Sequence, residues 1–201
     1  MAISTGGSSA SPYPIADGYG TKTATPPAEI TRVVPPRASV RARVRGMIYK
    51  TGVTAHTVTT MVTLSEVKVD SDAAKDQAVD VLSAVPTATD GSLLATGDWM
   101  ILQHEDGVWE AYKVASLSGL SVTLTNLAKK VLKGTRAFFV GAPGDHTDRQ
   151  YTVSASETLS PAGEGAMVCA ATKDDQPILV LSNNITNAGE LKWLAWDYAV
   201  V

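Results

Sequence analysis

The sequence predicts an all-β protein, made of small β-barrel or β-sandwich modules that follow an extended N-terminal arm. Two observations predict the β modules: many short segments alternate polar and apolar residues between Gly, Asp and Pro turns, and Thr, Val, Ala and Ser dominate a chain with few aromatic residues. A third observation predicts the arm, because six of the ten prolines fall within the first 38 residues.

Residues 1–38 are expected to form the arm and to contribute little to the fold of the body. Their proline and glycine content disfavours local structure, and the Pro35-Pro36 pair favours an extended path. Apolar residues are nevertheless spaced along the segment, so the arm is expected to order on a neighbouring molecule. These anchor residues are Ile3, Tyr13, Ile15, Tyr19, Ile30, Val33 and Val34.

Charge is distributed unevenly. The chain carries a net charge of −3, yet residues 1–50 hold seven Lys and Arg against Asp17 and Glu29, which is +5 for this part and leaves −8 for the rest. The asymmetry indicates an acidic or polyanionic partner for the front of the chain, with a solvated basic strand face as the alternative.

The clearest strand in the front half covers residues 39–45. Its apolar residues Val40, Ala42 and Val44 alternate with arginines, which therefore share the opposite face. Those arginines are Arg41, Arg43 and Arg45, with Arg37 close by. Arginines in a row bind carboxylates in a bidentate manner, so the expected partner is an acidic protein surface rather than nucleic acid. The absence of interleaved aromatic residues argues against the nucleic-acid alternative.

The next two segments differ in how clearly they predict structure. Residues 47–69 are rich in Thr and Val and predict one or two strands. Residues 72–84 fit a short amphipathic helix that ends before Pro86, and we favour the helix slightly. The alternation of Val79, Val81 and Val85 fits a strand almost as well.

Residues 93–141 carry the strongest β signal. Gly97-Asp98, Asp106-Gly107 and Ser118-Gly119 mark tight turns between apolar segments. Strands are therefore expected at residues 99–103, 108–114, 120–125 and 136–140.

The Pro143-Gly144-Asp145 turn is the best internal boundary. It divides the chain into the arm at 1–38, a β-barrel-like domain at 39–143 and a C-terminal β-sheet or sandwich region at 144–201. The last strand carries Trp193, Trp196 and Tyr198 and is apolar on both faces, so it is expected to be buried. Packing against another subunit is favoured, and packing between the two halves of the body is the alternative.

No catalytic, cofactor or metal site is predicted, and the chain is not expected to be an enzyme. Ser65-Glu66-Val67-Lys68 matches the S-x-x-K pattern of serine acylases, but strand alternation separates its Ser and Lys. Asp70, Asp72 and Asp76 lack the glycine and glutamate of a calcium loop and are expected to cap a helix. Cys169 lies in an apolar segment typical of a buried strand.

Three fragments resemble virion proteins of tailed bacteriophages, most closely head decoration proteins. They are residues 94–102, 106–110 and 116–124, which share a rhythm of Gly-Asp, apolar strand, Asp-Gly, strand, Ser-Gly and Val-Thr-Leu. The resemblance implies a non-enzymatic capsid cement protein without a cofactor, often a homotrimer. Its implied partners are the major capsid protein and copies of itself, with neither nucleic acid nor a membrane.

The sequence contains neither an apolar run of 18 residues nor a secretory signal, so synthesis and use in a cytoplasm, or release by lysis, are expected. The resemblance implies that this is the cytoplasm of a bacterial host and that the protein sits on the capsid surface. The alternative is a receptor-binding or glycan-binding protein of the tail or fibre, with the C-terminal Trp cluster as its site. The residues expected at a capsid or subunit interface are Ile3, Tyr13, Ile15, Tyr19, Ile30, Arg37, Arg41, Arg43, Arg45, Trp193, Trp196 and Tyr198.

Overall fold

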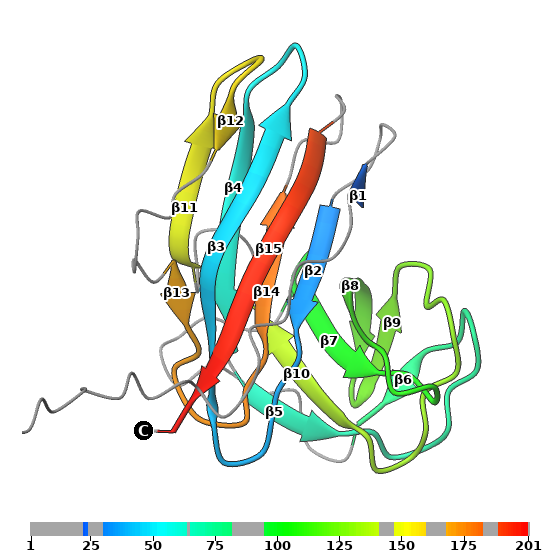
Figure 1. The fold of residues 1–201 in the computed structure, drawn as a ribbon. Coiled ribbons are helices and arrows are strands. Elements are labelled where there is room, and N and C mark those ends of the chain that lie inside the picture. The colour runs from blue at the N-terminus through cyan, green and yellow to red at the C-terminus, as the bar shows by residue number, and fades with distance from the viewer. Residues whose placement is uncertain are drawn as a thin grey trace, which may run out of the picture.

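The all-β prediction is confirmed by the computed structural model of the chain (Figure 1). The structure describes residues 22–23, 30–63, 65–81, 95–140, 147–159, 168–182 and 189–200. No helix occurs within these ranges.

All strand pairs are antiparallel and form three sheets. The strands are β1 Lys22–Thr23, β2 Ile30–Val34, β3 Arg41–Thr51, β4 His56–Val62, β5 Ser65–Lys68, β6 Val79–Asp80, β7 Trp99–Gln103, β8 Trp109–Ser118, β9 Ser121–Leu124, β10 Arg136–Val140, β11 Thr147–Val153, β12 Thr158–Leu159, β13 Cys169–Ala170, β14 Ile178–Ser182 and β15 Gly189–Ala199.

Two of the sheets pack as a sandwich. The first has the order β1-β15-β3-β12, with β13 also on β3, and the second has the order β11-β4-β14-β2. Alternation along the strands sends one set of side chains between the sheets. Val44 of β3, Trp196 of β15, Val58 of β4 and Ile178 of β14 meet there in a buried core.

Residues 65–81 and 95–140 form a separate six-stranded module with the order β5-β10-β7-β8-β9-β6 and a core of its own. The module is inserted between β4 and β11, two neighbouring strands of the sandwich. The expected domain at 39–143 therefore contains two kinds of strand. β5 to β10 belong to the module, whereas β3 and β4 belong to the two sheets of the sandwich. β3 and β4 pair with the C-terminal strands β11, β14 and β15, because their alternating apolar residues face the sandwich core.

Part of the expected arm belongs to the body. Residues 30–34 form β2, which pairs with β14 along its whole length. Successive side chains of a strand point to opposite faces, so Val34 enters the sandwich core while Val33 enters a second core on the outer face of the sheet. Lys22–Thr23 adds to the edge of β15. Residues 1–21 and 24–29 of the expected arm lie outside the described residues.

The helix expected at 72–84 is wrong for its described part. Residues 72–81 form no helix, and the strand alternative applies at Val79–Asp80, which pairs with β9. Val79 and Val81 are buried in the module core, whereas Asp80 between them is exposed. Burial of alternate valines thus overrides a weak helical periodicity. Residues 82–84 lie outside the described part.

A third apolar core fixes the module to the sandwich. Trp99, Ile101, Phe138 and Val140 of the module pack against Val33, Met61, Leu179 and Leu181, which line the outer face of the β11-β4-β14-β2 sheet. Trp109 packs at its margin, tilted over Phe138 with ring centroids 5.8 Å apart. One face of this sheet therefore serves the sandwich and the other serves the module.

Replacing Leu179 with alanine is expected to lower the free energy of unfolding by about 2–5 kcal/mol, because a fully buried side chain of the third core is lost. Urea denaturation followed by tryptophan fluorescence measures the change. Val53→Ala, at a side chain that is 83% exposed, is the control and should change the value by less than about 0.5 kcal/mol. An equally small effect of Leu179→Ala would contradict the joining role of the core.

Candidate functional site

The arginines of β3 meet carboxylates of their own chain. Asp197 of β15 receives two hydrogen bonds of 2.7 Å from Nε and Nη2 of Arg43, and Nε of Arg45 lies 3.9 Å from the same carboxylate. Nε of Arg41 lies 3.5 Å from Oδ1 of Asp174. The acidic surface expected for these arginines is therefore supplied by the C-terminal part of the chain itself.

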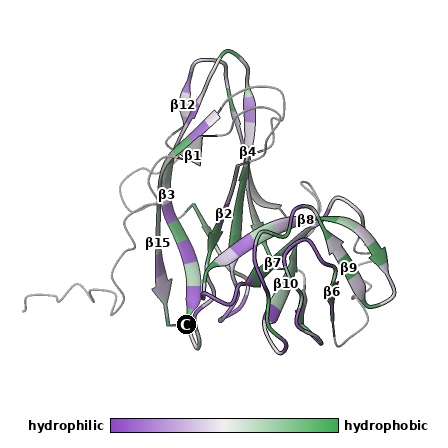
Figure 2. Ribbon diagram, turned by 90° about the vertical axis from the view of Figure 1, so that its right-hand side faces the viewer, coloured by the Kyte–Doolittle hydropathy of each residue, from purple (hydrophilic) through white to green (hydrophobic). Residues whose placement is uncertain are grey.

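The strand register explains why one carboxylate serves two arginines. Asp197 stands opposite Arg43 in the β3–β15 ladder, and its side chain lies on the outer face of the sheet between those of Arg43 and Arg45. Figure 2 shows the polar and apolar segments that follow one another along β3. The Arg43–Asp197 pair has the bidentate geometry that makes Arg–carboxylate contacts strong.

Two of the expected interface aromatics are buried inside this subunit. Trp196 is 6% exposed and Tyr198 is 8% exposed, and both belong to the sandwich core. The Tyr198 hydroxyl donates to the carbonyl of Pro35 over 3.0 Å, and the Arg37 guanidinium lies 5.6 Å from the Tyr198 ring centroid. The apolar character of the last strand therefore has an explanation within the subunit, which removes the physical argument for an interface there.

The remaining expected interface residues are only partly placed. Ile30 begins β2 opposite Ser182, and Trp193 stands opposite Ile48 in the β3–β15 ladder. Ile3, Tyr13, Ile15 and Tyr19 lie outside the described residues.

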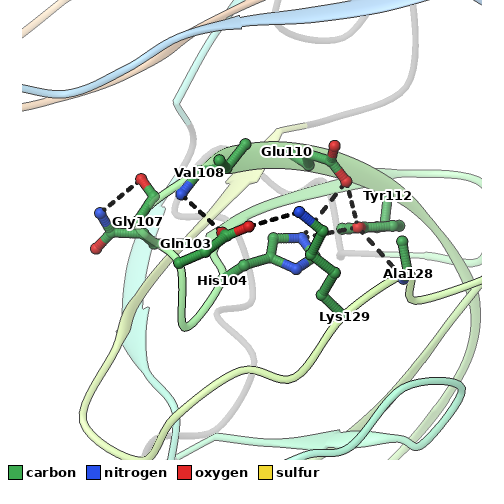
Figure 3. Close-up of polar contacts among 9 residues, drawn as sticks. Gln103, His104, Gly107, Val108, Glu110, Tyr112, Ala128 and Lys129 are labelled. Carbon is green, nitrogen blue, oxygen red and sulfur yellow. Dashed lines mark hydrogen bonds and ion pairs between the residues drawn. The ribbon is translucent and has the colours of Figure 1, made fainter.

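A polar cluster joins the β7–β8 hairpin to residues 128–129 (Figure 3). Tyr112 donates to Oε2 of Glu110 over 2.6 Å and lies 2.8 Å from Nε2 of His104. Because Tyr112 gives its only proton to Glu110, His104 must donate through Nε2, and its Nδ1 is then an acceptor. That Nδ1 is buried and makes no hydrogen bond. Lys129 pairs with Asp106 beside the cluster.

A second Tyr–His pair lies in the sandwich. Ser182 donates to the Tyr49 hydroxyl over 2.6 Å, and that hydroxyl lies 2.7 Å from Nδ1 of His56. Tyr49 therefore donates to Nδ1, and His56 carries its proton on a buried Nε2 without a hydrogen-bond partner. Gly189 is required beside the pair, because a Cβ there would lie 2.0 Å from the Tyr49 oxygen.

The two histidines are held neutral. Burial lowers the pKa of His56, and burial also lowers the pKa of His104 against the opposing effect of Glu110 and Asp106. Burial raises the pKa of the Tyr49 and Tyr112 hydroxyls. All three members of the sandwich group are buried, so its hydrogen bonds satisfy polar groups inside the fold. Tyr49 and His56 come from two different sheets, and no local sequence motif marks such a pair.

The acidic residues considered for calcium or helix capping have other partners. Oδ1 of Asp72 accepts from the backbone N–H of Lys133, and its carboxylate pairs with Lys130. These contacts lower the pKa of Asp72. Asp70 pairs with Lys133 at 3.6 Å. Residues 70–76 thus bind the loop that precedes β10, and the described part of the chain holds no cluster of three metal-ligating side chains.

A groove runs between β2 and β8. Residues 31–33 of β2, Val108 and residues 109–112 of β8 line a hollow of about 260 Å³. An adjoining hollow of about 290 Å³ continues along β8 and ends at Thr125 and Asn126. The groove lies between β2, the edge strand of its sheet, and the first part of β8, and its lining includes Arg32, Trp109 and Glu110. Within the described ranges, no helix is long and apolar enough to cross a membrane.

Comparisons with known proteins give little similarity. No family model matches the chain, and no curated protein matches it. Among solved structures, VP17, a capsid protein of bacteriophage P23-77, is similar at 12% sequence identity and a TM-score of 0.23, over 92% of this chain and 99% of that chain. A score this low does not establish a shared fold, and no function follows from it.

Replacing Asp197 with asparagine is expected to lower the free energy of unfolding by about 1–3 kcal/mol. The value lies below that of a fully buried ion pair because the Arg43 side chain is 27% exposed. Asp174→Asn, at the exposed pair with Arg41, is the control and should cost less than about 1 kcal/mol. Equal costs in urea denaturation would contradict the central place of Asp197.

Stability is expected to fall as the pH is lowered from 7.5 to 5.5. The folded pKa values of His56 and His104 lie below their unfolded value, so the unfolded state binds more protons once the pH drops below about 6.5. Urea midpoints at the two pH values measure the loss. His56→Gln with His104→Gln should flatten the dependence, whereas an unchanged dependence would assign it to other groups.

Proposed function

We propose that this protein is a non-enzymatic structural protein of a bacteriophage virion that binds and stabilises the capsid lattice as a decoration protein. The proposal is carried by three buried cores formed among the described residues 33–198, considered together with the composition of residues 1–21. Those first residues are rich in Gly, Ser and Pro and include the four apolar anchor residues Ile3, Tyr13, Ile15 and Tyr19. A self-supporting body that carries such a segment is suited to binding several neighbours at once.

The phage-like fragments support the proposal from another direction. Residues 94–124, which resemble head decoration proteins, contain strands β7, β8 and β9 of the six-stranded module. Their turns occur at Gly107 and Gly119, both with positive φ, as the Asp-Gly and Ser-Gly signals predict. The resemblance thus coincides with one continuous part of a sheet.

The proposed partners are the major capsid protein and further copies of this chain, and the proposed location is the capsid surface. Capsid contact is assigned to the arm, because the arginines of β3 have carboxylate partners and Trp196 and Tyr198 are buried within the subunit. A trimer rests on the resemblance alone. Burial of Trp196 also argues against the glycan-binding alternative, which requires this ring in an open groove.

Deletion of residues 2–21 is expected to abolish capsid binding. The thermal midpoint of the isolated protein should change by less than about 2 °C, because the deletion stops before β1. Co-sedimentation and negative-stain imaging with empty heads of the encoding phage measure binding. A full-length variant with Ile3, Tyr13, Ile15 and Tyr19 changed to serine is the matched test of the anchors and should bind as weakly as the deletion. Undiminished binding of both variants would refute the arm's role.

A further inference from the structure

The groove between β2 and β8 presents backbone hydrogen-bonding groups of a strand edge. β8 pairs with β7 over residues 109–113, whereas its pairing with β9 begins only at Val114. The other side of residues 109–113 therefore faces the groove, whose opposite wall is β2 at the edge of its own sheet.

The register identifies which residues of β8 point into the groove. The N–H of His104 donates to the carbonyl of Val108 over 2.9 Å, and the N–H of Val114 donates to the carbonyl of Asp98 over 2.7 Å. Even-numbered residues of this stretch thus direct their backbone groups toward β7. Backbone direction alternates along a strand, so Trp109 and Ala111 direct theirs toward the groove.

These groups have no strand partner within the described part of the chain. The next residue in the same direction, Lys113, accepts a hydrogen bond from the N–H of Thr125 over 2.9 Å, whereas no strand of the described ranges pairs with this side of Trp109 or Ala111. Both residues are only partly exposed. Backbone groups in this position need water or a ligand, and an extended peptide that adds to the strand edge supplies both donors and acceptors.

We propose that this edge of β8 is a docking site for the N-terminal arm of a neighbouring subunit, which adds as a strand through Pro12-Tyr13-Pro14-Ile15. The N–H groups of Tyr13 and Ile15 lie two residues apart and on the same side of an extended chain. They match the spacing of Trp109 and Ala111 on β8. The inference rests on the proposed role of the arm between molecules.

The two prolines suit an edge strand of this kind. Proline has no N–H, so Pro12 and Pro14 leave the arm without donors on its outer side, where no further strand is to be added. A proline also biases the preceding residue toward an extended conformation, which applies to Ser11 and Tyr13. Strand addition by this end of the chain has a precedent in the structure, because β1 pairs with the edge of β15.

Length and charge are compatible with a neighbour's groove. The 21 residues before β1 reach roughly 70 Å when extended, more than the diameter of one small domain. Asp17 is the only charged side chain among them. The segment at residues 12–15 therefore brings no charge into a groove that already contains Arg32 and Glu110.

The test is disulfide cross-linking between full-length variants in the absence of capsid. One protein carries Ala10→Cys or Ala16→Cys, which flank the docking segment and so cover both strand directions, and a second protein of different mass carries Val108→Cys in the groove. Heterodimers are expected for at least one combination. Val53→Cys, at the distant β3–β4 turn, is the control for collisions and should give at least tenfold less product. Cys169 is buried and is retained in every variant.

Backbone-modified peptides separate strand addition from other contacts. A peptide of residues 9–19 is expected to reduce heterodimer formation, and the same peptide N-methylated at Ala16 should compete equally, because that N–H points away from β8. N-methylation at Ile15 should abolish competition. Equal competition by both modified peptides would overturn strand addition. An intramolecular disulfide in the Ala16→Cys/Val108→Cys double variant, with no heterodimer from the mixtures, would overturn the assignment to a neighbour.

These outcomes are separable from those of the capsid assay. Capsid binding that requires residues 2–21, together with cross-linking at the level of the Val53→Cys control, would remove only the β8 docking site. Cross-linking without capsid binding would keep the docking site as a contact between subunits and remove the decoration role.

Discussion

The pairing of β3 with β15 is the interaction on which the rest of the sandwich depends. The two strands pair from Arg41 to Thr51, and their side chains fill one wall of the sandwich core. The same ladder places Asp197 beside the β3 arginines and brings Tyr198 to Pro35, at the end of β2. Arg43 and Asp197 are 154 residues apart in the chain, so a long loop must close before this pairing forms. The six-stranded module has shorter-range pairings and is expected to form first.

Local patterns predict the strands well where one face of a strand is buried. Arg41–Arg45 alternates as expected, and the turns at Gly107 and Gly119 are where the Asp-Gly and Ser-Gly pairs place them. What local pattern cannot supply is the identity of partners. The arginine face predicts a carboxylate surface, but only the fold reveals that Asp197 and Asp174 of the same chain provide it. The apolar final strand likewise predicts burial without stating which molecule buries it.

The arm is expected to reach residue 38, whereas in the structure residues 30–34 already form strand β2 of the body. The reason for this difference is related. Proline content suggests an extended chain, and an extended chain is also what an edge strand requires. Val33 and Val34 are 5% and 0% exposed because consecutive residues of β2 enter different cores. The Tyr–His pairs are hidden from the sequence in the same way. Tyr49 and His56 belong to opposite sheets, and the proton positions of the two histidines follow only from the direction of the hydrogen bonds.

β2 connects the proposed docking function to stability. The strand contributes to the sandwich core through Val34, to the joining core through Val33, and to the groove wall through Thr31 and Arg32. A peptide bound between β8 and β2 would therefore contact the module and the sandwich together. Ligands that bind only the folded state stabilise it by mass action, so an arm docked in this groove would stabilise the contact between the two parts of its host subunit as well as linking subunits. In a lattice, each subunit would then receive stabilisation from the arm of a neighbour, and assembly and folding stability would rise together.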